Sequence, residues 1–260
     1  TGISVIINFI WTPVLAWLLG YLFLNDNPQL GIGFLMLMVT PCTDWYLVFT
    51  GIARGNVALG TALLPLNFVL QLLLLPLYLL IFAGSLVQID LSSLIQGVLL
   101  VLVAPLLAAN LFRRIVQNLK GNAWLEDKIL SKIGINQILF LSLAIAAMFA
   151  SQGKILLDNP QIMLKMLVPV LIFFALNFII GQIISRLLKF TYEDTVALNL
   201  TTLARNSPLA LAIAVATFPD QPLIALALII GPLIELPVLA LIAQILLNSK
   251  KIQYVEDKTL

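Results

Sequence analysis

Three ionisable side chains interrupt long apolar stretches of the sequence and are the first candidates for chemistry: Asp44, Arg205 and Glu235. An ionised group at the centre of a membrane helix costs about 2.5–3.5 kcal/mol on insertion scales, so each needs a partner or a polar cavity. We expect Asp44 and Arg205 to form a charge pair, although such a pair can also be purely architectural. This leaves Glu235 without a partner and able to exchange a proton.

Cys42 is the single cysteine of the chain and lies two residues before Asp44. A lone cysteine is most simply a small buried apolar residue. Its sulfur is also a soft ligand suited to soft metals or trivalent metalloids. Neutral polar side chains near these positions either line a cavity or only join helices to one another; they are Thr43, Asn67, Gln71, Thr201, Asn206 and Ser207.

The composition indicates where these residues must lie. Of the 260 residues 61% are hydrophobic and 10% are charged, and the mean hydropathy is +1.08. Soluble domains carry about 25% charged residues, so a soluble globular enzyme and a nucleic-acid-binding protein are excluded. The chain has no histidine and one cysteine, which argues against histidine metal sites and an internal disulfide. We expect a polytopic membrane protein that is not an enzyme and has no cofactor.

Windows without charge predict eight membrane-spanning helices. They cover about 3–24, 30–54, 57–83, 93–112, 134–151, 162–187, 193–217 and 222–247. Placing the basic loop 113–133 in the cytoplasm puts most other lysine and arginine residues on the same side, as the positive-inside rule requires. We therefore expect a multi-pass protein of the plasma (inner) membrane with both ends of this chain in the cytoplasm.

Two of these spans are predicted to be broken near their centres. One contains Thr40-Pro41-Cys42-Thr43-Asp44 and the other Arg205-Asn206-Ser207-Pro208. Proline removes an N–H group and clashes with the preceding turn, although a simple kink is the alternative. Sliding the sequence so that Pro41 lies on Pro208 also lays Thr50 on Thr217 and Pro65 on Pro232. The overlaid copies would face opposite ways, and such inverted repeats with paired broken helices are typical of secondary transporters.

The same residues resemble a known family. The run Pro41–Asn56, with Pro41, Thr50 and Ala53-Arg54-Gly55 in place, resembles the first broken-helix motif of the bile acid:sodium symporter superfamily. Asn206-Ser207-Pro208-Leu209-Ala210 resembles its second. The stretch GPLIELPVL, Gly231–Leu239, differs only at Leu236 from a motif of the arsenite efflux permease (arsenical resistance) branch. In that branch a cysteine falls where Cys42 stands.

The sodium-coupled branch is less similar. Its Ser-Asn sodium ligands fall on Tyr46 and Leu47 here, and its Glu and Gln ligands fall on Thr201 and Arg205. The resemblance therefore implies the inverted repeat of ten helices, with a six-helix core domain and a four-helix panel domain, of which this chain would lack the first two helices. Residues 1–83 would be the first part of the core, 84–160 panel helices, and 161–260 the second part of the core.

The resemblance implies proton-coupled efflux of arsenite or a similar metalloid by alternating access. Cys42 would contact the substrate together with Thr43, Asn67, Asn206 and Ser207, and Glu235 would carry the proton. The partners would be a small inorganic or organic solute, protons and the lipid bilayer, with no nucleic acid. Two alternatives stay open: an organic-anion symporter in which Arg205 meets a carboxylate, and a non-transporting membrane scaffold or sensor.

Overall fold

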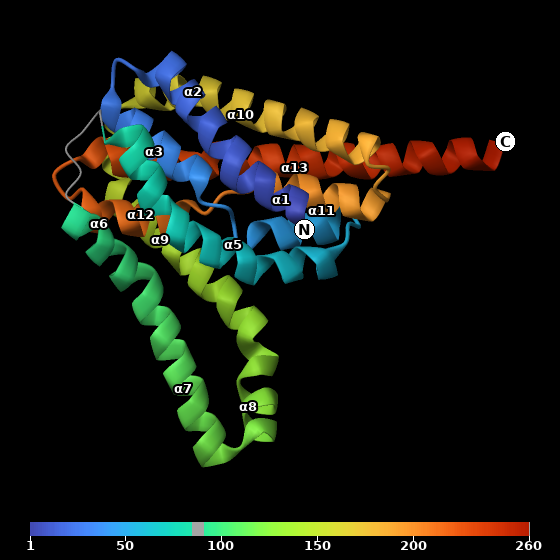
Figure 1. Cartoon of the computed structure of the whole chain (residues 1–260), viewed down its shortest axis with the longest axis horizontal. Helices are drawn as coiled ribbons and strands as arrows, with labels where there is room; N and C mark the ends of the chain where they lie inside the picture. Colours follow the sequence, from blue (N-terminus) through green and yellow to red (C-terminus); the bar gives the residue numbers. More distant parts are fainter. Residues whose placement is uncertain (85–90, 260) are drawn as a thin grey trace.

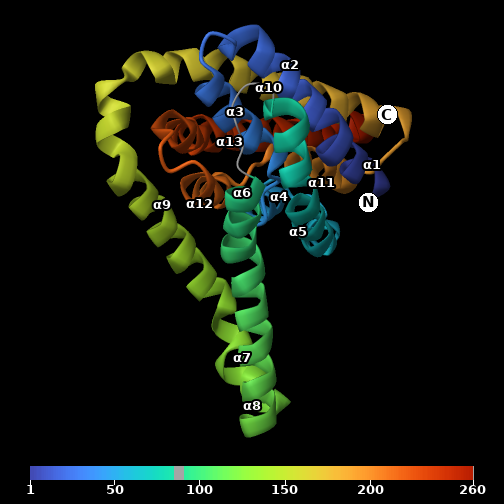
Figure 2. The same cartoon turned by 60° about the vertical axis from the view of Figure 1, so that its left-hand side comes forward.

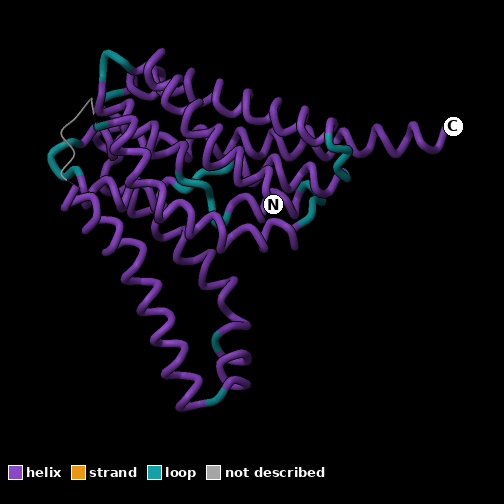
Figure 3. Tube along the Cα trace, in the orientation of Figure 1, coloured by secondary structure: helices purple, strands orange, loops and turns teal. Residues whose placement is uncertain are grey.

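The chain folds into helices joined by short loops (Figure 3). The computed structural model describes residues 1–84 and 91–259. Within these ranges the one strand-like feature is an isolated antiparallel bridge between Pro41 and Arg205. The predicted all-α polytopic fold is therefore confirmed. The segment predicted to contain the panel helices, 84–160, includes residues 85–90, which lie outside the described residues.

Five helical segments are long and apolar enough to cross a membrane: Gly2–Leu24, Val57–Phe82, Ser92–Lys120, Pro160–Leu187 and Pro222–Lys250. They are built from α1 (Gly2–Ile6), η1 (Ile7–Trp11) and α2 (Thr12–Leu24); α5 (Val57–Tyr78) and η2 (Leu79–Ala83); α6 (Leu91–Val98), η3 (Leu99–Val103) and α7 (Ala104–Lys120); α10 (Pro160–Leu187); and α13 (Pro222–Thr259). The remaining predicted spans correspond to α9 (Ile133–Asp158) and to two pairs of shorter helices.

Both predicted breaks are present. α3 (Pro28–Val39) is separated from α4 (Trp45–Ile52), and α11 (Tyr192–Leu203) is separated from α12 (Ser207–Thr217). Thr40 leaves helical geometry with φ −103° and ψ 93°, as expected for a residue that precedes proline. Pro208 lies in the first turn of α12, where the missing N–H group costs nothing. Each proline therefore ends or begins a helix and does not merely kink one.

Several helices extend beyond the predicted spans. α7 continues through Arg113 and Arg114 to Lys120, although the predicted span ends at 112. It stops at Gly121, whose φ of 82° is one that residues with a Cβ rarely adopt. α8 (Asn122–Lys128) and η4 (Leu130–Lys132) then lead into α9. Charge-free windows mark apolar membrane crossings, but a helix continues until its backbone is broken, so the predicted ends were too early.

The core of the molecule is formed around α3 and α13, which pack side by side (Figures 1 and 2). Every residue of α3 from Ile32 to Val39 is buried, as expected for a helix that is apolar on all sides. α2 also packs on α3, and α10 packs on both α2 and α13. The close approach of α3 and α13 depends on Gly33, because a Cβ there would lie 2.6 Å from the Ile224 carbonyl oxygen.

α7 and α9 project away from this core as a long hairpin (Figures 1 and 2). In the 18-residue apolar stretch within Ser92–Lys120, 22% of the residues are buried, compared with 67% in the corresponding stretch of Pro222–Lys250. The hairpin joins the core through α6 on α12 and α9 on α13. The hairpin lies within the segment predicted to form the panel helices. The division into core and panel domains stays a prediction.

Candidate functional site

The two broken spans cross at their breaks and bind each other through backbone hydrogen bonds. The Cys42 N–H group donates to the Ala204 carbonyl oxygen at 3.0 Å, and the Asn206 N–H group donates to the Thr40 carbonyl oxygen at 2.8 Å. Backbone groups released from a helix inside a membrane must be satisfied within the protein. Each break partly satisfies the other, and we call this junction of residues 40–44 and 204–208 the crossing.

Cys42 lies three residues before the first residue of α4, inside the crossing. Its Sγ accepts hydrogen bonds from the backbone N–H groups of Asp44 at 3.4 Å and Trp45 at 3.3 Å. The side chain is 2% exposed. The sulfur therefore accepts from the N–H groups of the N-cap residue and of the first residue of α4, which fixes its position relative to that helix.

Thr43 and Asn206 connect the two breaks through their side chains. Asn206 Nδ2 donates to Thr43 Oγ1 at 3.2 Å, and Thr43 Oγ1 donates to Asp44 Oδ2 at 3.1 Å. Asn206 Oδ1 accepts from the Leu209 N–H group at 3.1 Å and so caps α12. All three side chains of this chain of bonds are half-buried. The structure thus brings together Cys42, Thr43, Asp44 and Asn206.

α13 adds Glu235 to the crossing. Glu235 Oε1 accepts a hydrogen bond from the Arg205 backbone N–H group at 2.7 Å, and the Glu235 side chain is 3% exposed. Our expectation that Glu235 would lack a partner was wrong, because sequence cannot reveal a backbone donor freed by a helix break. One turn earlier on α13, a Cβ at Gly231 would lie 2.7 Å from Ser207 Oγ. Ser207 is therefore buried against α13.

The Arg205 side chain makes contacts of its own, apart from the backbone bond to Glu235. Its Nη2 donates to the Thr202 carbonyl oxygen and to Asn8 Oδ1, the latter at 3.4 Å. Its Cζ lies 5.1 Å from the centroid of the Phe173 ring, within cation–π range. Within the described residues, Nε and Nη1 have no hydrogen-bond partner. The predicted charge pair of Arg205 with Asp44 stays a prediction.

Asn67 lies on α5 and contacts α11 rather than Cys42. Its Nδ2 lies 3.5 Å from Thr201 Oγ1, and it is fully buried. Its Oδ1 and both amide atoms of Gln71, one turn further along, have no hydrogen-bond partner in the part of the chain that the structure describes. A buried polar atom without a partner costs about 1–3 kcal/mol. Asn67 thus belongs to a polar layer beside the crossing.

Two residues at this site were missed by the sequence analysis: Asn8 in the first span and Phe173 in α10. A signal for Asn8 was present, because Ser4, Asn8 and Thr12 recur every fourth residue in an apolar stretch and are all buried. That spacing places them on one face of a helix. No comparable signal exists for Phe173, which lies in an apolar stretch and differs from its neighbours only by its contact with Arg205.

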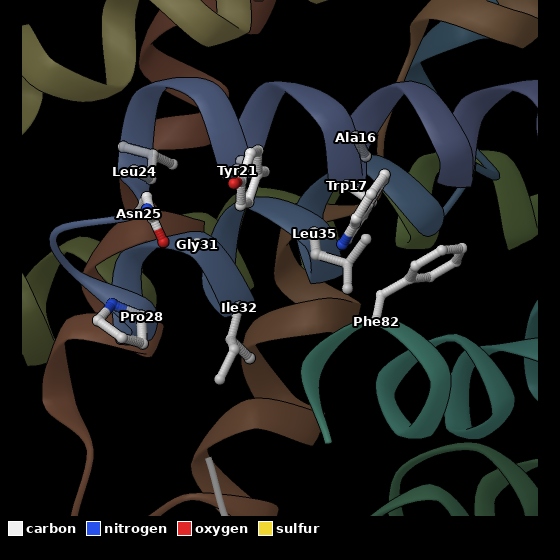
Figure 4. Close-up of a pocket in the computed structure, with 11 residues that line it drawn as sticks. Ala16, Trp17, Tyr21, Leu24, Asn25, Pro28, Gly31, Ile32, Leu35 and Phe82 are labelled. Carbon is white, nitrogen blue, oxygen red and sulfur yellow. The ribbon is translucent and has the colours of Figure 1, made fainter. Parts of the chain in front are cut away.

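Two cavities lie outside the crossing. One, of about 210 Å³, is bounded by α2 and α3, with Trp17 and Phe82 at one end and Asn25 and Pro28 at the other (Figure 4). The second, of about 260 Å³, lies between α1, α5 and α11, beside Ser4 and Asp194. Neither is lined by Cys42 or Glu235. Cys42 and Glu235 are buried in this conformation, and a solute could reach Cys42 only after the helices around it separate.

Comparison with known proteins gives a consistent pattern. The family model described as the Sodium Bile acid symporter family matches residues 2–159. The Arsenical-resistance protein Acr3 of Corynebacterium glutamicum is 31% identical over 92% of this chain and 67% of its own length. That of Alkaliphilus metalliredigens is 25% identical, covering 82% and 60%. An uncharacterised sodium-dependent transporter of Bacillus subtilis, YocS, is 24% identical, covering 83% and 64%.

Proposed function

Because this chain belongs to the Sodium Bile acid symporter family, whose members are membrane transporters, we propose that it is a secondary active transporter that exports arsenite or a similar metalloid in exchange for protons. The observation that carries the proposal is the placement of a buried thiol and a buried carboxylate at one junction of two broken helices. Two of the relatives carry arsenical resistance in their names. Broken helices are where secondary transporters hold their substrates.

The substrate step uses Cys42. Arsenite near neutral pH is an uncharged trihydroxide. The Cys42 sulfur forms a bond to arsenic while one arsenic–oxygen bond breaks, and the thiol proton leaves with the hydroxide as water. A soft sulfur suits a soft metalloid centre. Thr43 and Asn206, which are hydrogen-bonded to each other in the crossing, bind the remaining hydroxyl groups. Ser207 and Asn67 bind them if the crossing opens toward those two residues.

The proton step uses Glu235. As a carboxylate it accepts the Arg205 backbone N–H group, and hydrogen bonds to ionised acceptors are about twice as strong as neutral ones. Protonation of Glu235 weakens this bond and loosens the second break from α13. Water then hydrolyses the sulfur–arsenic bond on the outer side, which regenerates the thiol. A proton is thereby linked to a change in how the helices pack.

The orientation of the chain follows from its basic residues. The helix end and loop between α7 and α9 carry Arg113, Arg114, Lys120, Lys128 and Lys132, which favours a cytoplasmic position. The protein then lies in the plasma (inner) membrane with both ends of this chain on the cytoplasmic side. The projecting hairpin of α7 and α9 acts as panel helices against which the core, residues 1–83 and 161–260, moves.

The test is arsenite flux into proteoliposomes that contain the full-length protein, with an imposed proton or sodium gradient. We expect a proton gradient to drive flux and Cys42→Ser to abolish it. Met36→Leu is the matched control, because it removes another fully buried sulfur without removing a thiol. Undiminished flux in the Cys42→Ser variant would eliminate the thiol from the mechanism.

A second candidate function has one observation in its favour. Two nitrogens of the buried Arg205 guanidinium have no hydrogen-bond partner within the described residues, and a guanidinium is well suited to bind a carboxylate. This favours an organic-anion symporter, and YocS is similar to the chain. Sodium-dependent uptake of a carboxylate that is lost in Arg205→Ala would support this alternative over arsenite export.

A further inference from the structure

The first span widens into a π-helical turn where it passes the crossing. η1 begins at Ile7 and ends at Trp11, between two α-helical segments. Pro13 has no N–H group to donate to the carbonyl oxygen of Phe9, four residues earlier. That oxygen accepts instead from the Tyr78 hydroxyl at 2.6 Å. π-helical turns of this kind occur frequently at functional sites, and this one contains Asn8.

The Asn8 amide bonds to two parts of the second break at once. Its Nδ2 donates to the Thr201 carbonyl oxygen at 3.3 Å, and its Oδ1 accepts from Arg205 Nη2 at 3.4 Å. The side chain is fully buried. Thr201 lies in the last turn of α11 and Arg205 lies just beyond its end. Asn8 thus links the first span to the end of α11 and to the side chain that follows it.

Arg205 is held from two sides. Glu235 on α13 accepts its backbone N–H group, and Asn8 on η1 accepts from its guanidinium. The other contacts of the guanidinium are the Thr202 carbonyl oxygen, which belongs to the same break, and the Phe173 ring. Of these contacts, only the one to Asn8 is a hydrogen bond between the Arg205 side chain and another span. Loss of the Asn8 amide therefore removes the one hydrogen bond among these that ties the guanidinium to another span, and leaves it held only by Thr202 and Phe173.

We propose that Asn8 is a positioning residue of the crossing: it orients Arg205 and holds the second break against the first span, so that the crossing opens only when these bonds are released. This rests on the proposed function only in assuming that the crossing opens during transport. The identity of the solute does not enter. Ser4 and Thr12, one turn on either side of Asn8, share its buried face, but neither hydroxyl has a hydrogen-bond partner in the described residues.

Cys42 provides a reporter for this proposal, because it is the only cysteine in the chain and is buried in the crossing. The rate at which a maleimide labels Cys42 in the purified full-length protein measures how often the crossing opens. Full-length protein that carries further cysteines would first have them replaced. We expect Asn8→Ala to raise this rate by at least about 2- to 10-fold, the effect of losing one ordinary hydrogen bond, and to lower transport.

Asn177→Ala is the matched control. Asn177 is equally buried and donates to the Phe173 carbonyl oxygen of its own helix at 3.1 Å, but its hydrogen bond does not reach the crossing. We expect this variant to label at the rate of the unsubstituted protein. Asn8→Asp keeps an oxygen for Arg205 and removes the donor to Thr201, so we expect its labelling rate to lie below that of Asn8→Ala.

A double substitution separates positioning from simple packing. If Asn8 acts through Arg205, Arg205→Met raises labelling by itself, and adding Asn8→Ala raises it little further. Equal increases from Asn8→Ala in both backgrounds would overturn the proposal, as would unchanged labelling in Asn8→Ala. If Asn8→Ala does not fold, Asn8→Asp against Asn177→Asp gives the same comparison. A protein that carries neither arsenite nor carboxylates would refute the proposed function, while the labelling rates would still decide the role of Asn8.

Discussion

Replacing Glu235 separates its role in holding the crossing from its role in carrying a proton. In the native protein the Arg205 N–H group donates to the carboxylate at 2.7 Å. Glutamine keeps a side-chain oxygen that can accept this hydrogen bond, but it cannot exchange a proton. Leucine has a similar volume and offers no acceptor. The two variants therefore differ in whether this hydrogen bond can form, whereas neither can exchange a proton.

The expected losses of stability follow from the hydrogen bond that each variant keeps or loses at this buried site. A hydrogen bond to a charged group contributes about 1.5–3 kcal/mol and a neutral one about 0.5–1.5 kcal/mol, so Glu235→Gln should cost about 1 kcal/mol of stability. Glu235→Leu leaves the Arg205 N–H group without its partner. The group is buried, because Arg205 is 2% exposed and Glu235 is 3% exposed. An unsatisfied buried donor costs about 1–3 kcal/mol, so we expect leucine to be less stable than glutamine by this amount.

The assay combines unfolding in detergent with arsenite flux in proteoliposomes under a pH gradient. We expect Glu235→Gln to fold, and its flux to lose all dependence on the pH gradient. Glu193→Gln is the control, because that carboxylate is 46% exposed and pairs with Lys250 at 2.6 Å, away from the crossing. Gradient-driven flux that survives in Glu235→Gln would refute the proton role. Equal stability of the glutamine and leucine variants would refute the structural reasoning.

Two further predictions test the packing and the loops. Gly33→Ala should destabilise the protein by about 1–3 kcal/mol, because its Cβ would lie 2.6 Å from the Ile224 carbonyl oxygen, whereas Gly51→Ala, with 3.9 Å to its nearest atom, should leave the thermal midpoint in detergent unchanged or slightly raised. The ion pair with Lys165 lowers the pKa of Asp26. Its stabilisation is therefore complete above the ordinary Asp pKa of about 4 and is lost as the pH falls through the lower native value. Asp26→Asn should remove this acid-dependent part of the thermal midpoint, which appears as the pH falls below about 4, and an unchanged pH profile would contradict it.

The burial of the thiol and of two ionisable side chains at the crossing has a consequence for transport. Cys42, Arg205 and Glu235 are each at most 3% exposed, and neither described cavity is lined by Cys42 or Glu235. A transporter that works by alternating access must pass through a state in which its site is sealed. Hydrogen bonds join the first break, α13 and the first span to the second break and its flanking turn, so these are the contacts that opening must change.

The sequence by itself determined the helical membrane fold and the location of both breaks. Apolar stretches of about 20 residues can cross a bilayer only as helices, because backbone groups in lipid must be satisfied within the segment. Proline at 41 and 208 cannot continue a helix without losing a bond. These are local properties, and the structure agrees with them. The ends of helices such as α7 were predicted less well, because a charged residue ends an apolar stretch without ending a helix.

Only the tertiary structure decided which groups meet. Sequence reasoning gave Glu235 no partner, since it compared side chains with side chains, whereas its observed partner is the Arg205 backbone N–H group. It also overlooked Asn8, whose bonds to Thr201 and Arg205 join residues almost 200 positions apart. The physical reason is the same in both cases. A broken helix exposes backbone donors and acceptors, and what satisfies them depends on how distant helices pack, which no local pattern of residue types contains.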